Sequence, residues 1–333
     1  MLSLELSPEE QEEWLTQINT WAGDLGDMEL AITAVTQGWD YPPLVAVLQG
    51  HITDKGVWEG EAPDYADQLA GARLRILGRQ ERFQEYLYLA EAEGEHYLYV
   101  TMLAQLEQIP KALAEARQLL TSPNEFFGLA QVLAGQGQME AALEIGEFGL
   151  GVAEPGHTAV TIDQSGLPVA SGGSKRELAI WLRDQAEQAG RPSLALEAAK
   201  VAFHHGGILA NYQAVERLAG DDWPLIKLEL LPTLVKGGFG VEVIDIYLYE
   251  GMLAEAIKKI DAGGCFYYGH DLAKVIAATR EKYPDWGIHK YRQLAERIMD
   301  GGKRRIMTRP CPICARLVTF MPNTTGWTNG LPI

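Results

Sequence analysis

The residues with the clearest chemical potential are two cysteines near the end of the chain. Cys311 and Cys314 enclose two residues, a spacing that supplies two sulfur ligands for zinc. Tetrahedral zinc needs about four sulfur or nitrogen ligands, and no cysteine or histidine follows the pair. His289 lies upstream of the pair, in a predicted helix. The alternative that would still complete a metal site is one shared between the two chains of a dimer. We expect no metal ligand set within one chain and interpret the pair as incidental.

Other residues that could do chemistry have simpler explanations. His204 and His205 end a predicted helix, where a cation favours the helix dipole, so we expect a capping or solvent-exposed role. Gly149-x-Gly151 imitates part of a dinucleotide fingerprint but follows a predicted helix instead of a strand. The glycines of 237–240 lack the Lys-Ser/Thr of a phosphate-binding loop. The sequence therefore predicts no catalytic residue, no cofactor and no enzyme.

Tyrosine is the one residue type whose clustering could mark a binding surface. Tyrosine anchors interfaces because it offers apolar area and one polar tip, but in stacked helices aromatic side chains more often fill the core between repeats. We favour the core interpretation. The clusters are Tyr86, Tyr88, Tyr97 and Tyr99, then Tyr247, Tyr249, Tyr267 and Tyr268.

Charge and cysteine usage limit the classes of partner. The 333 residues carry a formal charge of −17, which repels nucleic-acid phosphates and anionic lipids. We therefore expect a protein partner, no membrane contact and no direct nucleic-acid binding. Three cysteines do not make a disulfide framework, and the first residues lack a basic stretch followed by an apolar one. No apolar run reaches the roughly 18 residues of a membrane span, so we expect the cytoplasm.

Helix signals dominate the chain. Ser7, Ser122 and Ser174 each precede a glutamate by three residues, the spacing of a capping box. Apolar residues between these signals recur with helical period, as in Phe126, Leu129, Ala130 and Leu133. No segment alternates convincingly with the period of a strand, and 241–246 is more consistent with a helix. The sequence predicts an all-α protein.

A repeat emerges when the turns between helices are aligned. Similar turns begin at Gly78, near 108 and at Gly137, and again at Gly190, near 221 and at Gly251. The period is about 30 residues, which holds two short helices and two turns. One helix pair cannot bury its apolar face alone, whereas stacked neighbours can. We therefore expect a solenoid or superhelix of antiparallel helix pairs.

Composition divides the expected array into four parts. Residues 1–150 and 175–302 form N-terminal and C-terminal helical repeat blocks. Residues 151–174 are rich in Gly, Ser and Pro, which predicts a flexible loop between the blocks. Residues 303–333 are expected to be a poorly ordered basic tail, since 301–333 contain five Lys or Arg and no Asp or Glu.

The turn pattern, with Ala in the helix that follows, resembles the tetratricopeptide repeat. A closer resemblance is to the helical region that follows the zinc finger in bacterial SWIM zinc-finger proteins. It covers about residues 10–300 and rests on helical patterning and a few aromatic anchors. These are the segments 38–50, 72–77 and 85–90, together with Trp181, Leu182, Tyr212 and Trp223.

The chain departs from the SWIM family at its metal site. A SWIM finger needs Cys-x-Cys followed downstream by Cys-x-His, and no such set exists here. The resemblance therefore implies the helical half without its finger, and it assigns no zinc ligand to any residue of this sequence. The chain could then be a fragment of a longer family protein, with the abrupt tail as an altered C-terminus.

Two classes of function follow from these observations. The leading expectation is a non-catalytic helical-repeat scaffold for protein–protein interaction. The alternative is a zinc-associated, nucleic-acid-related module whose SWIM-type finger comes from another chain or has been lost. Binding residues and partner identity are not indicated by any motif.

The tail provides the first testable prediction. Deleting 306–333 should barely change the melting temperature, and a zinc chelator should leave the intact protein unaffected, because the tail lacks capping signals and a second ligand pair. Thermal unfolding by circular dichroism measures both effects. A drop of several degrees, or aggregation of the truncated protein, would instead mean that Leu317, Phe320 and Trp327 cap the last helix pair.

Overall fold

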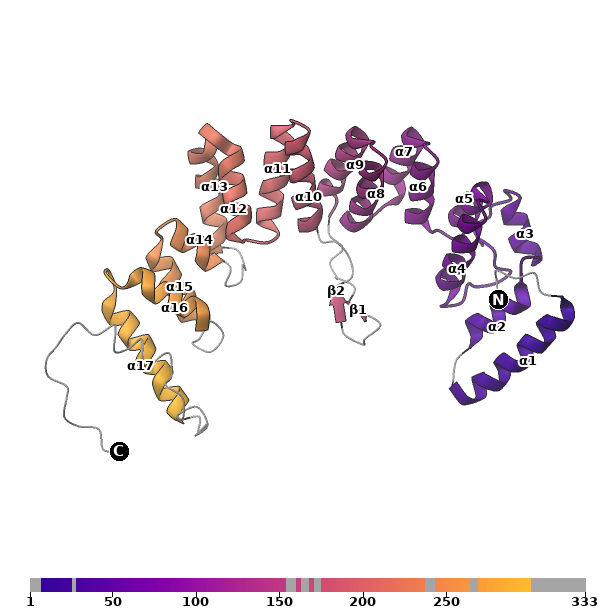
Figure 1. Ribbon diagram of the computed structural model, residues 1–333, viewed down its shortest axis with the longest axis horizontal. Coiled ribbons are helices and arrows are strands. Elements are labelled where there is room, and N and C mark those ends of the chain that lie inside the picture. Colours follow the sequence, from indigo (N-terminus) through magenta and orange to yellow (C-terminus); the bar gives the residue numbers. More distant parts are fainter. Residues whose placement is uncertain are drawn as a thin grey trace. The chain divides into compact units, whose positions relative to one another are not determined.

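The computed structural model describes residues 7–25, 28–153, 160–162, 168–170, 175–236, 243–263 and 269–300. Within these residues the chain is an all-α fold of neighbouring, packed helix pairs, as expected (Figure 1). The first helices are α1 Pro8–Leu25, α2 Glu29–Gln37, α3 Pro42–Leu48, α4 Ala66–Arg79, α5 Phe83–Ala92, α6 His96–Gln105, α7 Ile109–Leu119, α8 Pro123–Gly135, α9 Met139–Gly151, α10 Lys175–Gln188 and α11 Pro192–His204. They are followed by α12 Leu209–Ala219, the 3₁₀-helix η1 Gly220–Asp222, α13 Trp223–Lys236, α14 Val243–Tyr249, α15 Leu253–Gly263, α16 Gly269–Thr279 and α17 Pro284–Asp300.

The helices group into two compact units, residues 1–198 and 199–333. The expected division into helical repeat blocks at the 151–174 segment stays a prediction. On the two sides of that segment, α10 packs against both α8 and α9, with Leu178 and Leu182 fully buried. Packing within the first unit therefore continues past the 151–174 segment.

The segment 151–174 also contains a short hairpin that the sequence did not predict. Strands β1 Val160–Ile162 and β2 Pro168–Ala170 pair antiparallel, with Thr161 opposite Val169. The remainder of the segment from residue 154 lies outside the described residues, so its expected flexibility stays a prediction.

Two of the three predicted capping boxes form. At the start of α8, the Ser122 hydroxyl accepts from the Glu125 backbone N–H, and the Glu125 carboxylate accepts from the Ser122 N–H at 2.9 Å. Ser7 and Glu10 make the same reciprocal pair at the start of α1. Each box satisfies backbone donors that the first turn of a helix leaves unpaired. The third predicted box begins at Ser174, outside the described residues.

The repeated element is a three-residue turn whose middle residue is left-handed. Gly137, Gly190 and Gly251 occupy this position with φ between +69° and +78°. The following backbone N–H then bonds the carbonyl five residues earlier, as from Gln138 to Leu133 at 2.9 Å. This arrangement satisfies a carbonyl in the last turn of the first helix and reverses the chain into the second.

Two of these turns carry a glutamate where the others carry glycine. Glu81 and Glu107 adopt φ of +58° and +59° between α4 and α5 and between α6 and α7. The expected turn residue Gly78 instead lies inside α4, close to the Tyr86 ring. The alignment on glycines therefore misplaced this turn, because a strained glutamate has no distinguishing sequence pattern.

Close helix packing in the first unit depends on glycines of α9. A Cβ added at Gly149 would stand 2.6 Å from the Phe126 Cβ of α8 and 3.0 Å from Leu178 Cδ2 of α10. A Cβ at Gly146 would stand 3.1 Å from Leu182 Cδ1. Real Cβ atoms do not approach other atoms as closely as 2.6 Å, so α9 can contact both neighbours only through a bare backbone.

The N-terminal part of the first unit buries a cation. Arg73 of α4 is 1% exposed and donates to Gln37 Oε1 of α2 at 2.9 Å. Burial lowers the pKa of Arg73 to about 10, and the nearby charge of Glu93 opposes this effect. Glu93 itself accepts from the Val57 N–H at 2.8 Å and from Trp58 Nε1 at 3.0 Å. These bonds fasten the connection between α3 and α4 onto α5.

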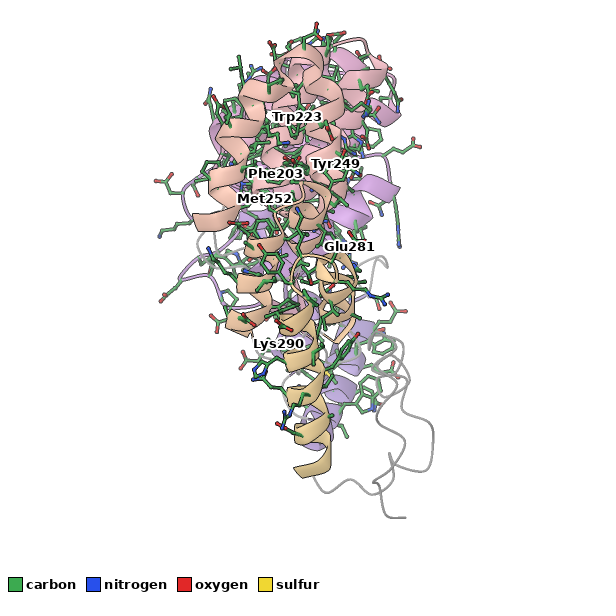
Figure 2. All side chains as sticks on the ribbon, turned by 90° about the vertical axis from the view of Figure 1, so that its left-hand side faces the viewer. Phe203, Trp223, Tyr249, Met252, Glu281 and Lys290 are labelled. Carbon is green, nitrogen blue, oxygen red and sulfur yellow. The ribbon has the colours of Figure 1, made fainter. Side chains whose placement is uncertain are left out.

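The second unit has an aromatic and polar core of its own. Tyr212 of α12 is fully buried between Phe203 and Trp223, with ring centroids 5.7 and 5.1 Å away. Its hydroxyl donates to Glu250 Oε1 at 2.8 Å, and Glu250 also pairs with Lys227. Burial, then the hydrogen bond to Glu250, raises the pKa of Tyr212. Figure 2 shows this unit facing the viewer, with Phe203 and Trp223 labelled.

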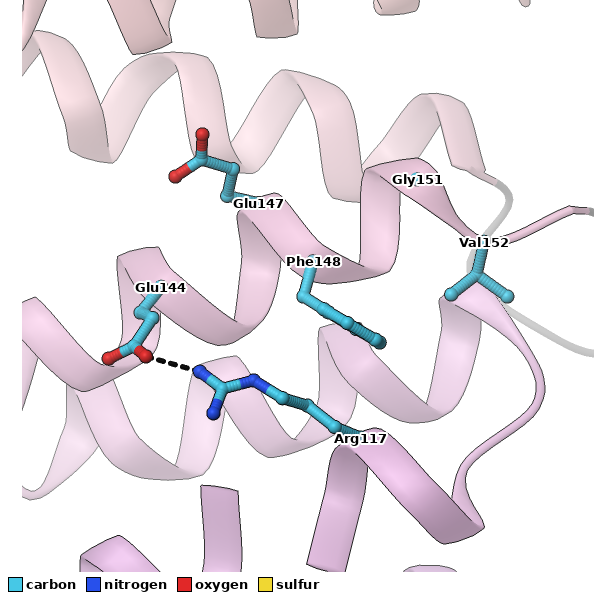
Figure 3. A pocket seen from close by; sticks show the side chains of 6 residues that line it. All are labelled: Arg117, Glu144, Glu147, Phe148, Gly151 and Val152. Carbon is cyan, nitrogen blue, oxygen red and sulfur yellow. Dashed lines mark hydrogen bonds and ion pairs between the residues drawn. The ribbon is translucent and has the colours of Figure 1, made fainter. Parts of the chain in front are cut away.

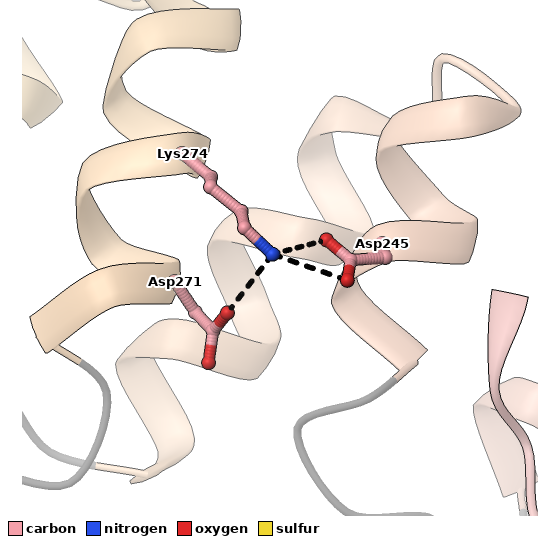
Figure 4. A network of polar contacts seen from close by, with 3 residues as sticks. All are labelled: Asp245, Asp271 and Lys274. Carbon is pink, nitrogen blue, oxygen red and sulfur yellow. Dashed lines mark hydrogen bonds and ion pairs between the residues drawn. The ribbon is translucent and has the colours of Figure 1, made fainter.

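An ion-pair network joins α14 and α16 of the second unit (Figure 4). The Lys274 ammonium donates to both Asp245 oxygens, at 2.8 and 3.1 Å, and lies 3.6 Å from Asp271. These contacts raise the pKa of Lys274, with the Asp245 hydrogen bond as the largest cause. The side chains are partly exposed, so solvent screens the network and it fixes orientation more than it adds stability.

The turn between α6 and α7 provides a stability prediction. Glu107→Gly should stabilise the protein by about 0.5–1 kcal/mol, because glycine removes the strain of a left-handed side-chain-bearing residue. Equilibrium urea unfolding measures the change. Glu115→Gly, in the interior of α7, is the matched control and should destabilise by about 1 kcal/mol. Destabilisation by Glu107→Gly as large as that of the control would contradict this explanation of the turn.

Candidate interaction surface

The structure leaves the predicted metal candidates apart or undescribed. All three cysteines, including Cys311 and Cys314, lie outside the described residues. His289 lies on α17, where its ring nitrogen is 2.9 Å from the Gln293 side-chain amide. In the part of the chain that the structure describes, no three His, Cys, Asp or Glu side chains gather closely enough to hold a metal ion. The expectation that the cysteine pair binds no metal stays a prediction.

The other motifs have structural explanations where they are described. Burial lowers the pKa of His204, and the neighbouring His205 and Lys200 act in the same direction. His204 and His205 are exposed at the end of α11, which agrees with the solvent-exposed role, whereas the lowered pKa makes His204 less suited to the cationic capping role. Gly149 allows α9 to pack closely against α8 and α10. This packing role accounts for the first glycine of Gly149-x-Gly151 without a bound nucleotide. The 237–240 glycines lie outside the described residues.

Half of the six clustered tyrosines that the structure describes are buried, in line with the core interpretation. Tyr86, Tyr99 and Tyr247 are buried, whereas Tyr88 and Tyr97 are half-buried. Tyr249 is the exception at 48% exposure, and its hydroxyl donates to Glu216 at 2.7 Å. Tyr267 and Tyr268 lie outside the described residues. Among the described cluster members, the core interpretation therefore fits the three buried tyrosines, and Tyr249 alone is exposed.

A shallow, open groove lies on α7 and α9 of the first unit (Figure 3). Its volume is about 480 Å³. Phe148 of α9 lies at its rim, 41% exposed. The groove is lined by Arg117, Glu144, Glu147, Phe148, Gly151 and Val152.

The sequence of α9 determines what the groove presents. Residues 142, 143, 145, 146 and 149 face the core, so the opposite stripe is left exposed. Along this stripe Glu140, Glu144 and Glu147 accompany Phe148, which cannot enter the core where α9 lies close to its neighbours. The Phe148 ring instead packs on the Phe126 ring at 5.4 Å between centroids, which leaves its outer face uncovered by α8.

Existing cations occupy part of this acidic stripe. Arg117 of α7 pairs with Glu144, and its guanidinium also lies 5.9 Å from the centroid of the Phe148 ring. Arg191 pairs with Glu140. Glu147 makes no ion pair or hydrogen bond with any described side chain and extends away from Arg117 in Figure 3. The groove thus combines the exposed face of Phe148, the carboxylate of Glu144, which is paired with Arg117, and the carboxylate of Glu147, which has no ion-pair partner among the described side chains.

Charge is distributed very unevenly between the two units. Residues 1–198 contain 31 Asp or Glu and 11 Lys or Arg, a net charge of −20. Residues 199–333 contain 14 Asp or Glu and 17 Lys or Arg, a net charge of +3. The acidity of the chain is therefore a property of the unit that carries the groove, and the basic tail accounts for only part of the asymmetry.

Comparisons with known proteins assign this fold to no family. No protein-family model, no curated protein and no solved structure matches the chain. Among the described helices, none combines the length and apolar character needed to cross a membrane.

Sequence reasoning missed the groove because each of its residues looks ordinary in isolation. Arg117, Glu144 and Glu147 fit the general pattern of solvated helix faces. One signal was available: Phe148 falls among three glutamates on one side of a helix whose other side is fully apolar. The second signal was the separate charge of residues 1–198, which a count over the whole chain conceals.

Proposed function

We propose that this protein is a non-catalytic helical-repeat scaffold that binds a protein partner in the cytoplasm. The observation that carries the proposal is the groove on α7 and α9, set in a unit with a net charge of −20. An apolar rim supplies area that is removed from water on binding, and carboxylates supply orientation and a fast electrostatic encounter.

The sign of the charge favours a basic protein over the other macromolecules. Nucleic-acid phosphates and anionic lipid headgroups would be repelled by the first unit. A partner with exposed Lys and Arg would be attracted, with an association rate that falls as salt increases. The tetratricopeptide-like and SWIM-like resemblances agree with a scaffold of helix pairs and add no residue to the surface.

The zinc-associated module remains the alternative, and Cys311 and Cys314 are the only residues that favour it. In that alternative a finger from another chain would complete the metal site. The two proposals differ in their dependence on zinc: a scaffold that acts through the first unit binds its partner equally well after chelation.

Partner capture from a native lysate of the source cells, followed by reconstitution from purified components, tests the proposal. We expect a basic protein that binds saturably with a Kd of about 1 μM or tighter, equivalent to about −8 kcal/mol. Affinity should fall steeply between about 0.05 and 0.5 M salt and should not respond to a chelator. Failure of every candidate to bind in purified form would overturn the proposal, and strict dependence on stoichiometric zinc would favour the alternative.

A further inference from the structure

We propose that the α7/α9 groove is the docking site for a basic segment of the partner, one that places a large apolar side chain next to a Lys or Arg. This inference rests on the proposed scaffold function and identifies the surface and the chemistry of the ligand. The groove is defined by Arg117, Glu144, Glu147, Phe148, Gly151 and Val152.

The apolar half of the site is the exposed face of Phe148 with Gly151 and Val152. Phe148 retains 41% of its surface in contact with water although α8 covers its other side. Gly151 has no side chain, and a Cβ placed there would meet no atom within 4 Å. The space beside the ring is therefore open to one large side chain, which would bury apolar area on both partners.

The polar half of the site is Glu147. Glu144 and Glu147 lie three residues apart on α9, which places both carboxylates on the same side of the helix as the groove. Glu144 is already paired with Arg117, whereas Glu147 has no cationic partner among the described residues. A Lys or Arg of the ligand would pair with Glu147 while an adjacent apolar side chain covers Phe148.

Arg117 occupies the position that a ligand cation would also favour. Its guanidinium pairs with Glu144 and lies over the Phe148 ring, so the site already accommodates a cation against this aromatic face. Both contacts are solvent-exposed and therefore weak, and a ligand can displace them. Arg117 thus competes with a basic segment, so its removal should strengthen binding.

The other exposed apolar surfaces give no comparable argument. Leu225 and Leu228 of α13 are 67% and 70% exposed and lie one turn apart, but no charge pattern around them indicates an occupant. The buried Arg73 has an unpartnered Nε, but at 1% exposure it offers no access to a ligand. The groove is distinguished by an available carboxylate beside an exposed aromatic ring.

The test uses the intact protein and three fluorescent peptides of about 18 residues, enough for five helical turns. The first peptide is an amphipathic Lys/Leu sequence, the second replaces Leu with Ser, and the third replaces Lys with Glu. Fluorescence anisotropy at low salt gives each Kd. We expect saturable binding of the Lys/Leu peptide, weaker binding of the Lys/Ser peptide and none of the Glu/Leu peptide.

Variants of the groove assign the binding to these residues. Phe148→Ala should weaken Lys/Leu binding about tenfold or more, and Glu147→Gln about fivefold. Arg117→Gln should tighten it about threefold, because it removes the competing cation. Glu147→Gln removes no contact within the described structure, so it tests the site even if Phe148→Ala unfolds the protein, and circular dichroism checks folding of each variant.

Two charge controls separate the groove from the general acidity of the first unit. Glu13→Gln removes an exposed carboxylate of α1, and Arg75→Gln removes an exposed cation of α4. Each should change the Kd by less than about twofold. Groove variants that shift affinity no more than these controls would overturn the proposed site while leaving the scaffold function intact. Absence of any Lys/Leu binding would overturn the proposed ligand class, whereas the reconstituted native partner reports on the scaffold function independently.

Discussion

The rest of the first unit depends on how closely α9 approaches its two neighbours. A helix pair has an apolar stripe on each side and is stable only when further helices cover both stripes. Gly149 allows the α9 backbone to contact both Phe126 of α8 and Leu178 of α10. Because the interior has no space for a larger side chain there, the contact also fixes the rotation of α9 about its own axis.

That rotation is what creates the candidate binding surface. With Ala142, Leu143, Ile145, Gly146 and Gly149 turned toward the core, the opposite side of α9 presents three glutamates and Phe148. Arg117 reaches this stripe because α7 packs beside α9 in the same unit. The groove is therefore a consequence of repeat packing and requires no special loop or strained backbone. For this reason no local sequence motif indicates it.

The fold was largely predictable, because its signals are local. The capping boxes at Ser7 and Ser122, the helical apolar spacing of α8 and the glycine turns at 137, 190 and 251 identify helices and their connections from a few residues each. The turn at Glu81 was assigned to Gly78 instead, because a glutamate in a left-handed turn has no distinguishing sequence pattern. Likewise α1 continues through Gly23 to Leu25, although glycine commonly ends a helix.

The candidate surface was not predictable, because it depends on residues far apart in sequence. Arg117 and Glu144 pair across 27 positions, and Phe148 gains its place at the rim only from the contacts of Gly149 on the other side of the helix. The same limit applies to contacts across the 151–174 segment. Composition gives no sign that Leu178 and Leu182 of α10 are buried in a helix that packs against α8 and α9.

Hydrogen–deuterium exchange of the intact protein carrying Gly149→Ala tests the central claim most directly. The added methyl must displace Phe126 or Leu178, so the loss of packing should outweigh the gain in helix propensity by about 1–3 kcal/mol. We expect amide protection to fall together in α8, α9 and α10, because these helices share one buried contact. Unchanged protection, or a loss confined to α9, would show that the helix pairs are stable independently and would contradict the account.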